Sequence, residues 1–296
     1  MARIAIVFPL SLEPTGTPNN TDGRLETYYQ LETAFTSCAP LIKQNLLEKF
    51  QGHDVDIYVF ANYENLDQAQ IFKKQLMNLY PIKDFILEPW ENVKNKIPNK
   101  EKSSPKQPDG IWCNHILQPW NLKHALEHIH SYYGEYDYYM KSRLDIFPDN
   151  KCDVKLLFSQ SKSERYWLDK LYGYSTNSKF VVSGVVYTTG SNITPMYIND
   201  IQLFFDIACA QSIIKNFNKW IDFTADYFSR FDWNTYRSIN SCLMHRTLQG
   251  EECYILPESA WANLFLLSKV KLIEKRGVLD HRLYRKHMYQ ERNKIK

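Results

Sequence analysis

A near-continuous apolar run at the start of the chain most constrains its fold. Residues 3–10 carry Ile, Ala, Val, Phe and Leu almost without interruption, which is typical of a strand buried on both faces of a parallel sheet. Further strands are predicted at 55–60 and 85–87, and helices are predicted within 25–50 and 68–79. Because strands alternate with helices, we expect an α/β fold with a mostly parallel central sheet flanked by helices.

The rest of the chain continues this pattern with more helix. A stripe of apolar residues predicts a helix over 112–133. The next stretch, from Tyr136 to Asp149, reads Tyr-Asp-Tyr-Tyr-Met-Lys-Ser-Arg-Leu-Asp-Ile-Phe-Pro-Asp, and we expect it to begin as a strand. Amphipathic helices are expected over 203–217 and 220–245, so the C-terminal part is predicted to be largely helical. We predict one domain over 1–270, followed by a basic tail at 271–296.

Composition excludes several classes of protein. The 296 residues include 36 basic and 33 acidic side chains, a balance that argues against nucleic acid as a partner. No apolar run is long enough to span a membrane, and the first residues do not resemble a secretory signal. The six cysteines form no Cys-x-x-Cys pair, which argues against a zinc site and favours a reducing, cytoplasmic location.

Three charged residues at alternating positions are the first candidates for chemistry. Lys141, Arg143 and Asp145 follow a predicted strand, and side chains two residues apart on a strand share one face. Ligands of open α/β sheets bind beyond the carboxyl ends of the strands. There Asp145 could hold a divalent cation, and Arg143 or Lys141 could contact a phosphate. The alternative is a salt-bridge cluster on the surface.

The same rule places a nucleotide on the loops after the first two strands. Phe8, Pro9 and Leu10 end the first strand, and Asn62 follows the second. The chain has neither a Gly-x-Gly-x-x-Gly dinucleotide fingerprint nor a Walker phosphate loop. Ordinary packing at the strand ends is the alternative role for each of these residues.

The order of these parts resembles nucleotide-sugar glycosyltransferases of the GT-A fold, which are Rossmann-like. The matching features are Asp56-Ile-Tyr-Val-Phe60, a helix with Gln118 and Trp120, the Tyr136–Asp149 stretch, Asn199-Asp200-Ile-Gln202, and Pro257-Glu258. In this resemblance Arg143-x-Asp145 corresponds to the metal-binding Asp-x-Asp motif, with arginine at the first acidic position. It implies a nucleotide-sugar-binding half at 1–150 and an acceptor-binding half at 151–270.

The resemblance also implies roles for single residues. Asp145 would bind Mn²⁺ or Mg²⁺, and Lys141 and Arg143 would meet the donor diphosphate. Asp200 is the first candidate for the base that deprotonates the acceptor, and Glu258 is the second. A base opposite the leaving group would give inversion at the sugar; without one, retention stays open. Asp200 could instead be the N-cap of the following helix.

The implied acceptor is a glycan, a glycoprotein or a lipid-linked sugar. Gln118, Trp120, Ser183 and Gly184 are the predicted acceptor-binding residues, although a core position is the alternative for Trp120. Two other functions remain open. One is a catalytically inactive carbohydrate- or nucleotide-binding protein on the same fold. The other is a different nucleotide-binding α/β enzyme, such as a nucleotidyltransferase. A cytoplasmic enzyme at the periphery of a membrane also remains open.

Overall fold

A computed structural model gives the fold of most of the chain. The structure describes residues 1–14, 25, 27–96, 110–149, 155–158, 185–188, 201–229, 245–246, 253–254, 261, 264–265, 268, 270–274 and 281–283. Within these ranges, no helix is both long enough and apolar enough to cross a membrane.

A seven-stranded sheet forms the centre of the molecule, with the strand order β10-β6-β7-β4-β1-β2-β3. Its strands are β1 (Arg3–Ser11), β2 (Asp54–Tyr63), β3 (Ile82–Pro89), β4 (Tyr138–Lys141), β6 (Val185–Thr188), β7 (Leu203–Asp206) and β10 (Lys271–Glu274). β7 is antiparallel to both of its neighbours, and the other neighbouring pairs are parallel. The predicted α/β fold with a mostly parallel sheet is therefore confirmed.

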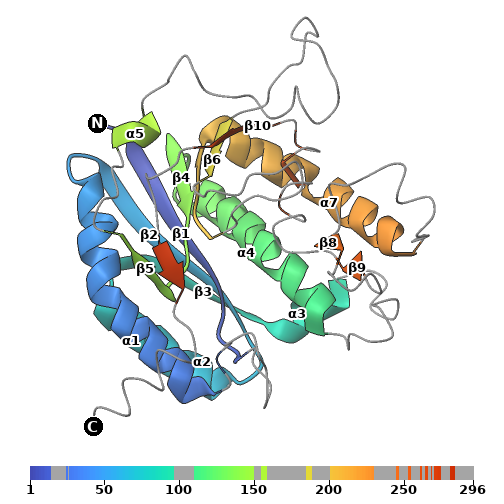
Figure 1. Ribbon diagram of the computed structural model, residues 1–296, viewed down its shortest axis with the longest axis horizontal. Coiled ribbons are helices and arrows are strands. Elements are labelled where there is room, and N and C mark those ends of the chain that lie inside the picture. The colour runs from blue at the N-terminus through green and yellow to red at the C-terminus, as the bar shows by residue number, and fades with distance from the viewer. Residues whose placement is uncertain are drawn as a thin grey trace, which may run out of the picture.

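Helices cover both faces of the sheet (Figure 1). One face packs against α1 (Tyr28–Asn45) and α2 (Leu66–Leu79), and the other packs against α4 (Gly110–Tyr132) and α7 (Ile207–Ser229). Shorter elements are η1 (Leu47–Phe50), α3 (Trp90–Lys96) and α5 (Lys155–Phe158). Two small sheets pair β5 (Ile146–Pro148) with β11 (His281–Leu283) and β8 (His245–Arg246) with β9 (Cys253–Tyr254).

The three layers explain the apolar run of β1. Val7 belongs to the core on the α4 side of the sheet, which also contains Leu126 of α4 and Phe217 of α7. Ile6 and Phe8 belong to the core on the α1 side. Because successive strand side chains point to opposite faces, a strand between two helical layers needs apolar residues at every position.

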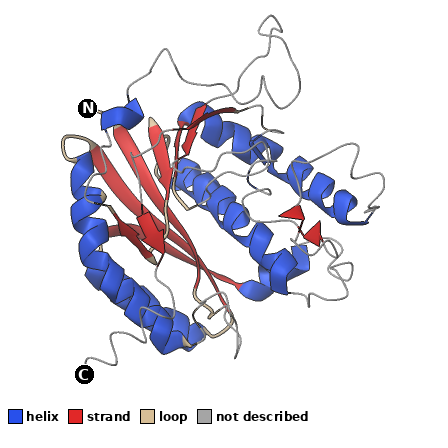
Figure 2. Cartoon of the chain, viewed as in Figure 1, coloured by secondary structure: helices blue, strands red, loops and turns tan. Residues whose placement is uncertain are grey.

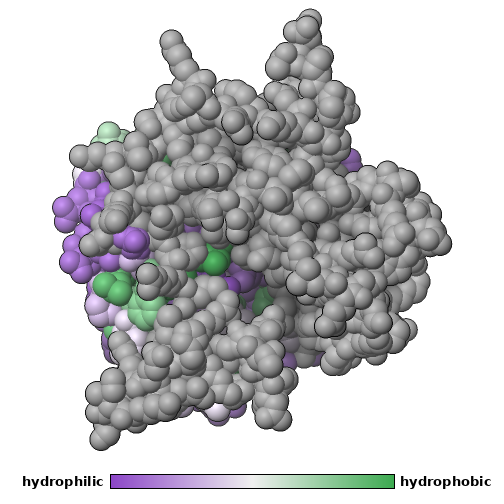
Figure 3. All heavy atoms as spheres, viewed as in Figure 1, coloured by the Kyte–Doolittle hydropathy of each residue, from purple (hydrophilic) through white to green (hydrophobic). Residues whose placement is uncertain are grey.

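The outer side of α1 is polar. Thr36, Lys43 and Gln44 are exposed there, whereas Phe35 and Ile42 are buried against the sheet. Most described atoms along the edge where α1 lies are hydrophilic in Figure 3. Pro40 is also exposed, and α1 continues through it.

The helix expected from residue 203 begins later. Leu203–Asp206 is strand β7 of the central sheet, whose strands are red in Figure 2, and α7 starts at Ile207. Leu203, Phe204 and Phe205 are fully buried, and a short run that is apolar on every side has the same pattern in a buried strand as in a buried helix. Asp206 Oδ1 accepts from Cys209 N at 2.8 Å, so Asp206 caps α7. The predicted alternative role of Asp200 as the cap of this helix is wrong.

The stretch from Tyr136 to Asp149 forms two strands instead of one. β4 ends at Lys141 and β5 begins at Ile146, so Arg143 and Asp145 lie in the connection between them. The predicted tail also contains strand structure, because β10 is an edge strand of the large sheet and β11 pairs with β5.

Candidate functional site

The carboxyl ends of β1 to β4 lie at one edge of the sheet because these four strands are parallel. Ser11 pairs with Asn62, and Asn62 pairs with Glu88. Tyr58 and Phe60 face the α4-side core, so strand alternation places Asn62 on that same face. Polar side chains from three strands and from α4 therefore meet at this edge.

Glu88 joins the ends of β2 and β3 to α4. Its Oε2 accepts from Trp120 Nε1 at 3.3 Å and from Asn62 Nδ2 at 3.4 Å. Asn62 is 1% exposed, while Glu88 is half-buried. The carboxylate is thus held in place by neutral donors, and it remains partly open to solvent.

Asn121 contributes a second buried amide from α4. Its Nδ2 donates to the carbonyl of Leu10 at 2.8 Å, just as Nδ2 of Asn62 donates to Glu88. These acceptors fix the orientation of both amides, since a flip would set oxygen against oxygen. The Oδ1 atoms of Asn62 and Asn121 are buried and have no hydrogen-bond partner in the described part of the chain. We call Asn62, Glu88 and Asn121 the acceptor cluster.

Cationic and donor groups gather at the end of β4. Lys141 is fully buried, its Nζ donates to Gln118 Oε1 at 2.7 Å, and the same Nζ lies 5.3 Å from the centre of the Trp261 ring. Trp261 is also fully buried, and its Nε1 is a donor without a partner among the described residues. Donors therefore dominate this side of the edge, and acceptors dominate the side of β2 and β3.

Arg143 and Asp145 follow as a bidentate ion pair. Arg143 Nε and Nη2 donate to Asp145 Oδ1 and Oδ2 at 2.8 and 2.7 Å. Ser142 precedes this pair, and its backbone N–H donates to the carbonyl of Val7 at 3.0 Å. Gln202 Nε2 donates to Ser142 Oγ at 3.3 Å, so Gln202 lies beside the connection between β4 and β5.

The described residues do not fit a divalent cation. Both oxygens of Asp145 accept hydrogen bonds from Arg143. Within the ranges that the structure describes, there is no group of three or more His, Cys, Asp or Glu side chains placed to hold a metal ion. The assignment of Asp145 as a metal ligand stays a prediction.

The other predicted site residues divide into two sets. Phe8 and Leu10 point their side chains into the α1-side core, which agrees with strand-end packing, and the Leu10 carbonyl accepts a hydrogen bond from Asn121. Pro9 lies between them in β1. Asp200, Glu258, Ser183 and Gly184 lie outside the described residues.

Three residues of this site were missed by sequence reasoning: Glu88, Asn121 and Trp261. Glu88 could have been found from the sequence, because it directly follows the strand predicted at 85–87. Asn62 likewise stands after the strand predicted at 55–60. Asn121 and Trp261 had no such signal, because a polar residue on a helix and a tryptophan in a late segment are common in any chain.

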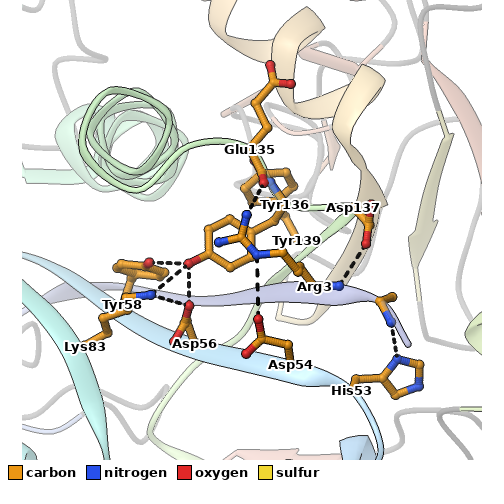
Figure 4. Close-up of polar contacts among 11 residues, drawn as sticks. Arg3, His53, Asp54, Asp56, Tyr58, Lys83, Glu135, Tyr136, Asp137 and Tyr139 are labelled. Atoms are coloured by element: carbon orange, nitrogen blue, oxygen red, sulfur yellow. Dashed lines mark hydrogen bonds and ion pairs between the residues drawn. The ribbon is translucent and has the colours of Figure 1, made fainter.

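A second polar network lies at the opposite, amino edge of the sheet (Figure 4). Tyr136 donates to Asp56 at 2.5 Å and shares a hydrogen bond with Tyr58 at 2.6 Å, while Lys83 pairs with Asp56 at 2.6 Å. Arg3 lies over the Tyr136 ring at 4.4 Å. These contacts connect the starts of β1, β2 and β3 to the chain before β4, and ligands of parallel sheets bind at the other edge. We assign this network a structural role.

The arrangement is that of an α/β protein with a polar site at the carboxyl edge of its parallel strands. No protein-family model matches the sequence, and no curated protein sequence matches it significantly. Solved structures do match, and three of them share 10% sequence identity with this chain.

One is a provisionally named nucleotide-diphospho-sugar transferase from Desulfovibrio desulfuricans G20, with a TM-score of 0.34 over 93% of this chain and 80% of that one. Another is mouse xyloside xylosyltransferase 1, with a TM-score of 0.37 over 77% of this chain and 76% of that one. A third is a nucleoside-diphosphate-sugar pyrophosphorylase from Vibrio cholerae RC9, with a TM-score of 0.32 over 92% of this chain and 91% of that one. Similarity at this level assigns no role to any residue of this chain.

Proposed function

We propose that this protein is a glycosyltransferase that moves a sugar from a nucleoside-diphosphate donor to a glycan, a glycoprotein or a lipid-linked acceptor. The observation that carries the proposal is the division of the carboxyl edge. Acceptor groups occupy the ends of β2 and β3, and the cation Lys141 occupies the end of β4. A nucleoside diphosphate has the matching division, with hydrogen-bond donors on its base and ribose and negative charge on its phosphates.

The nucleoside is expected at the acceptor cluster. Glu88 and the Oδ1 atoms of Asn62 and Asn121 would accept from N–H groups of the base or from ribose hydroxyls. A carboxylate would repel a phosphate at this position, so the diphosphate is expected toward β4. There Lys141 and Arg143 would bind it by charge-assisted hydrogen bonds.

Transfer requires one bond to break and another to form at the anomeric carbon. The acceptor hydroxyl oxygen attacks that carbon, the bond from the carbon to the diphosphate oxygen breaks, and the hydroxyl proton passes to a base. Asp200 remains our first candidate for the base and Glu258 the second. Inversion follows if the base sits opposite the leaving group.

The acceptor would lie beside the donor sugar. Gln118 and Trp120 are on the α4 segment next to both parts of the edge, and they join Ser183 and Gly184 as proposed acceptor contacts. The cytoplasm, with or without a peripheral membrane association, is the proposed location, because nucleotide sugars would be available there.

One observation favours a second candidate, a catalytically inactive nucleotide- or carbohydrate-binding protein on this fold. Asp145, the acidic residue of the motif, is held by Arg143 and is not presented to a cation. Such a protein would bind nucleotides without turnover.

Calorimetry with a panel of nucleotide sugars, together with an assay of donor hydrolysis, tests both candidates. We expect one nucleotide class to bind, and the bound donor to be hydrolysed slowly when no acceptor is present. Binding without hydrolysis or transfer would favour the inactive protein, and failure of every nucleotide sugar to bind would refute the glycosyltransferase. Asp200→Asn should keep donor binding and reduce turnover by roughly 10²–10⁴-fold, the usual contribution of a general base.

A further inference from the structure

Asp145 is placed to hold an arginine. Its two oxygens accept from Nε and Nη2 of the same guanidinium, in the bidentate geometry that gives strong and directional ion pairs. The side chains are only 28% and 17% exposed, so solvent screens this pair less than it screens a pair on the surface. A divalent cation could bind this carboxylate only in competition with Arg143.

Lys141 supplies a second fixed positive charge close by in the chain. The side chain is fully buried at the end of β4 and is held by the Gln118 amide oxygen and the face of the Trp261 ring. An anion that reaches a buried ammonium gains more than it would in water, because the surroundings have a low dielectric constant. Trp261 Nε1 adds a buried donor that has no partner among the described residues.

We propose that Lys141 and Arg143 neutralise the donor diphosphate in place of a divalent cation, with Asp145 as the positioning residue that orients Arg143. This inference rests on the proposed function. When the bond from the anomeric carbon to the diphosphate oxygen breaks, the electron pair stays on that oxygen, and the leaving group gains negative charge. Fixed cations can stabilise this charge without giving up a proton.

The central experiment measures the binding of UDP, GDP, ADP and CDP by calorimetry, once with excess EDTA and once with Mn²⁺. We expect the nucleotide that binds to have the same dissociation constant, within about threefold, in both buffers. Binding that requires Mn²⁺ would overturn this inference and leave the proposed function standing. If no nucleoside diphosphate binds in either buffer, the proposed function and this inference fail together.

Variants separate the roles of the charged residues. Lys141→Met keeps the length of the side chain but removes its charge. Arg143→Lys keeps the charge but removes the paired N–H donors of the guanidinium. Each should weaken binding in EDTA by roughly 10- to 100-fold, the range expected for a hydrogen bond to a charged group. Lys83→Met is the matched control, because it removes one positive charge at the opposite edge of the sheet. It should leave binding unchanged.

Asp145→Asn distinguishes a positioning residue from a metal ligand. A positioning role predicts that binding weakens by the same factor in EDTA and in Mn²⁺, since the disturbance reaches the nucleotide through Arg143. Loss of a Mn²⁺-dependent component alone would show that Asp145 binds metal and would overturn the proposal. Should Lys141→Met fail to fold, the partly exposed Arg143→Lys variant still decides the outcome, because unchanged binding in that variant contradicts the proposal.

Discussion

Glu88 illustrates how much a single side chain depends on its neighbours. Alone, it is a half-buried acid at the end of a strand. Trp120 and Asn62 both donate to its Oε2, which fixes the carboxylate at the edge where parallel strands bind ligands. Its position beside two buried amide oxygens makes this part of the site selective for hydrogen-bond donors.

We therefore expect Glu88→Gln to weaken the binding of a nucleoside diphosphate by roughly tenfold, because one charge-assisted hydrogen bond becomes a neutral one. The binding of inorganic pyrophosphate should not change, since it has no base or ribose. Calorimetry with both ligands makes the comparison. An equal loss for pyrophosphate would place the phosphates at Glu88 and reverse the proposed orientation of the nucleotide.

Among the elements, ion pairs and hydrogen bonds connect the starts of the parallel strands, and the candidate site lies at their carboxyl ends. At the amino edge, burial raises the pKa of Asp56, but hydrogen bonds from Lys83 and Tyr136 lower it by more, so the net shift is downward. Burial likewise opposes the net lowering of the pKa of Asp84, which His128 and Tyr133 cause by hydrogen bonding. Asp56 in β2 and Asp84 in β3 therefore stabilise the fold when their carboxyl groups are ionised.

The sign of these shifts predicts acid sensitivity. A carboxyl whose pKa is lower in the folded state stabilises the fold fully above its unfolded pKa of about 4, and it loses that contribution as pH falls through the folded pKa. Urea unfolding at a series of pH values should show stability falling below about pH 4. Asp56→Asn should cost about 1–3 kcal/mol at neutral pH and make the acid-dependent fall shallower. An identical pH profile in the variant would contradict this account.

Over the whole molecule, the two predicted halves share the central sheet and the core on its α4 side. β7, from the second half, pairs with β4 of the first half. Trp120 packs edge-on against Phe217, with ring centres 5.9 Å apart, and both belong to the α4-side core. The boundary near residue 150 is therefore unlike a linker between domains, across which few contacts are made.

A fragment of residues 1–150 should consequently not fold by itself. It would lack β7 and α7, which would expose one edge of β4 and the apolar residues of the α4-side core. Circular dichroism during urea titration should show no cooperative transition for the fragment, whereas the full chain should show one. A sigmoidal transition in the fragment would instead support an independent nucleotide-binding half.

The sequence alone determined the layers of this protein. Apolar runs such as residues 3–10 and the helical stripes between them follow from local periodicity, so the α/β architecture and the carboxyl edge as the place for a site could be predicted. Asn62, Lys141 and Arg143 were predicted as donor-binding residues in this way, because the end of a strand is visible in the sequence, and that role stays a prediction.

Only the tertiary structure decided which groups meet. Leu203–Asp206 became a strand because β4 and β6 offered pairing partners on both sides, which no local pattern contains. The contacts of Trp120 with Glu88, of Trp261 with Lys141 and of Asn121 with Leu10 join residues far apart in the chain. Side-chain partners of this kind depend on the packing of α4 and the sheet, and local propensity does not encode that packing.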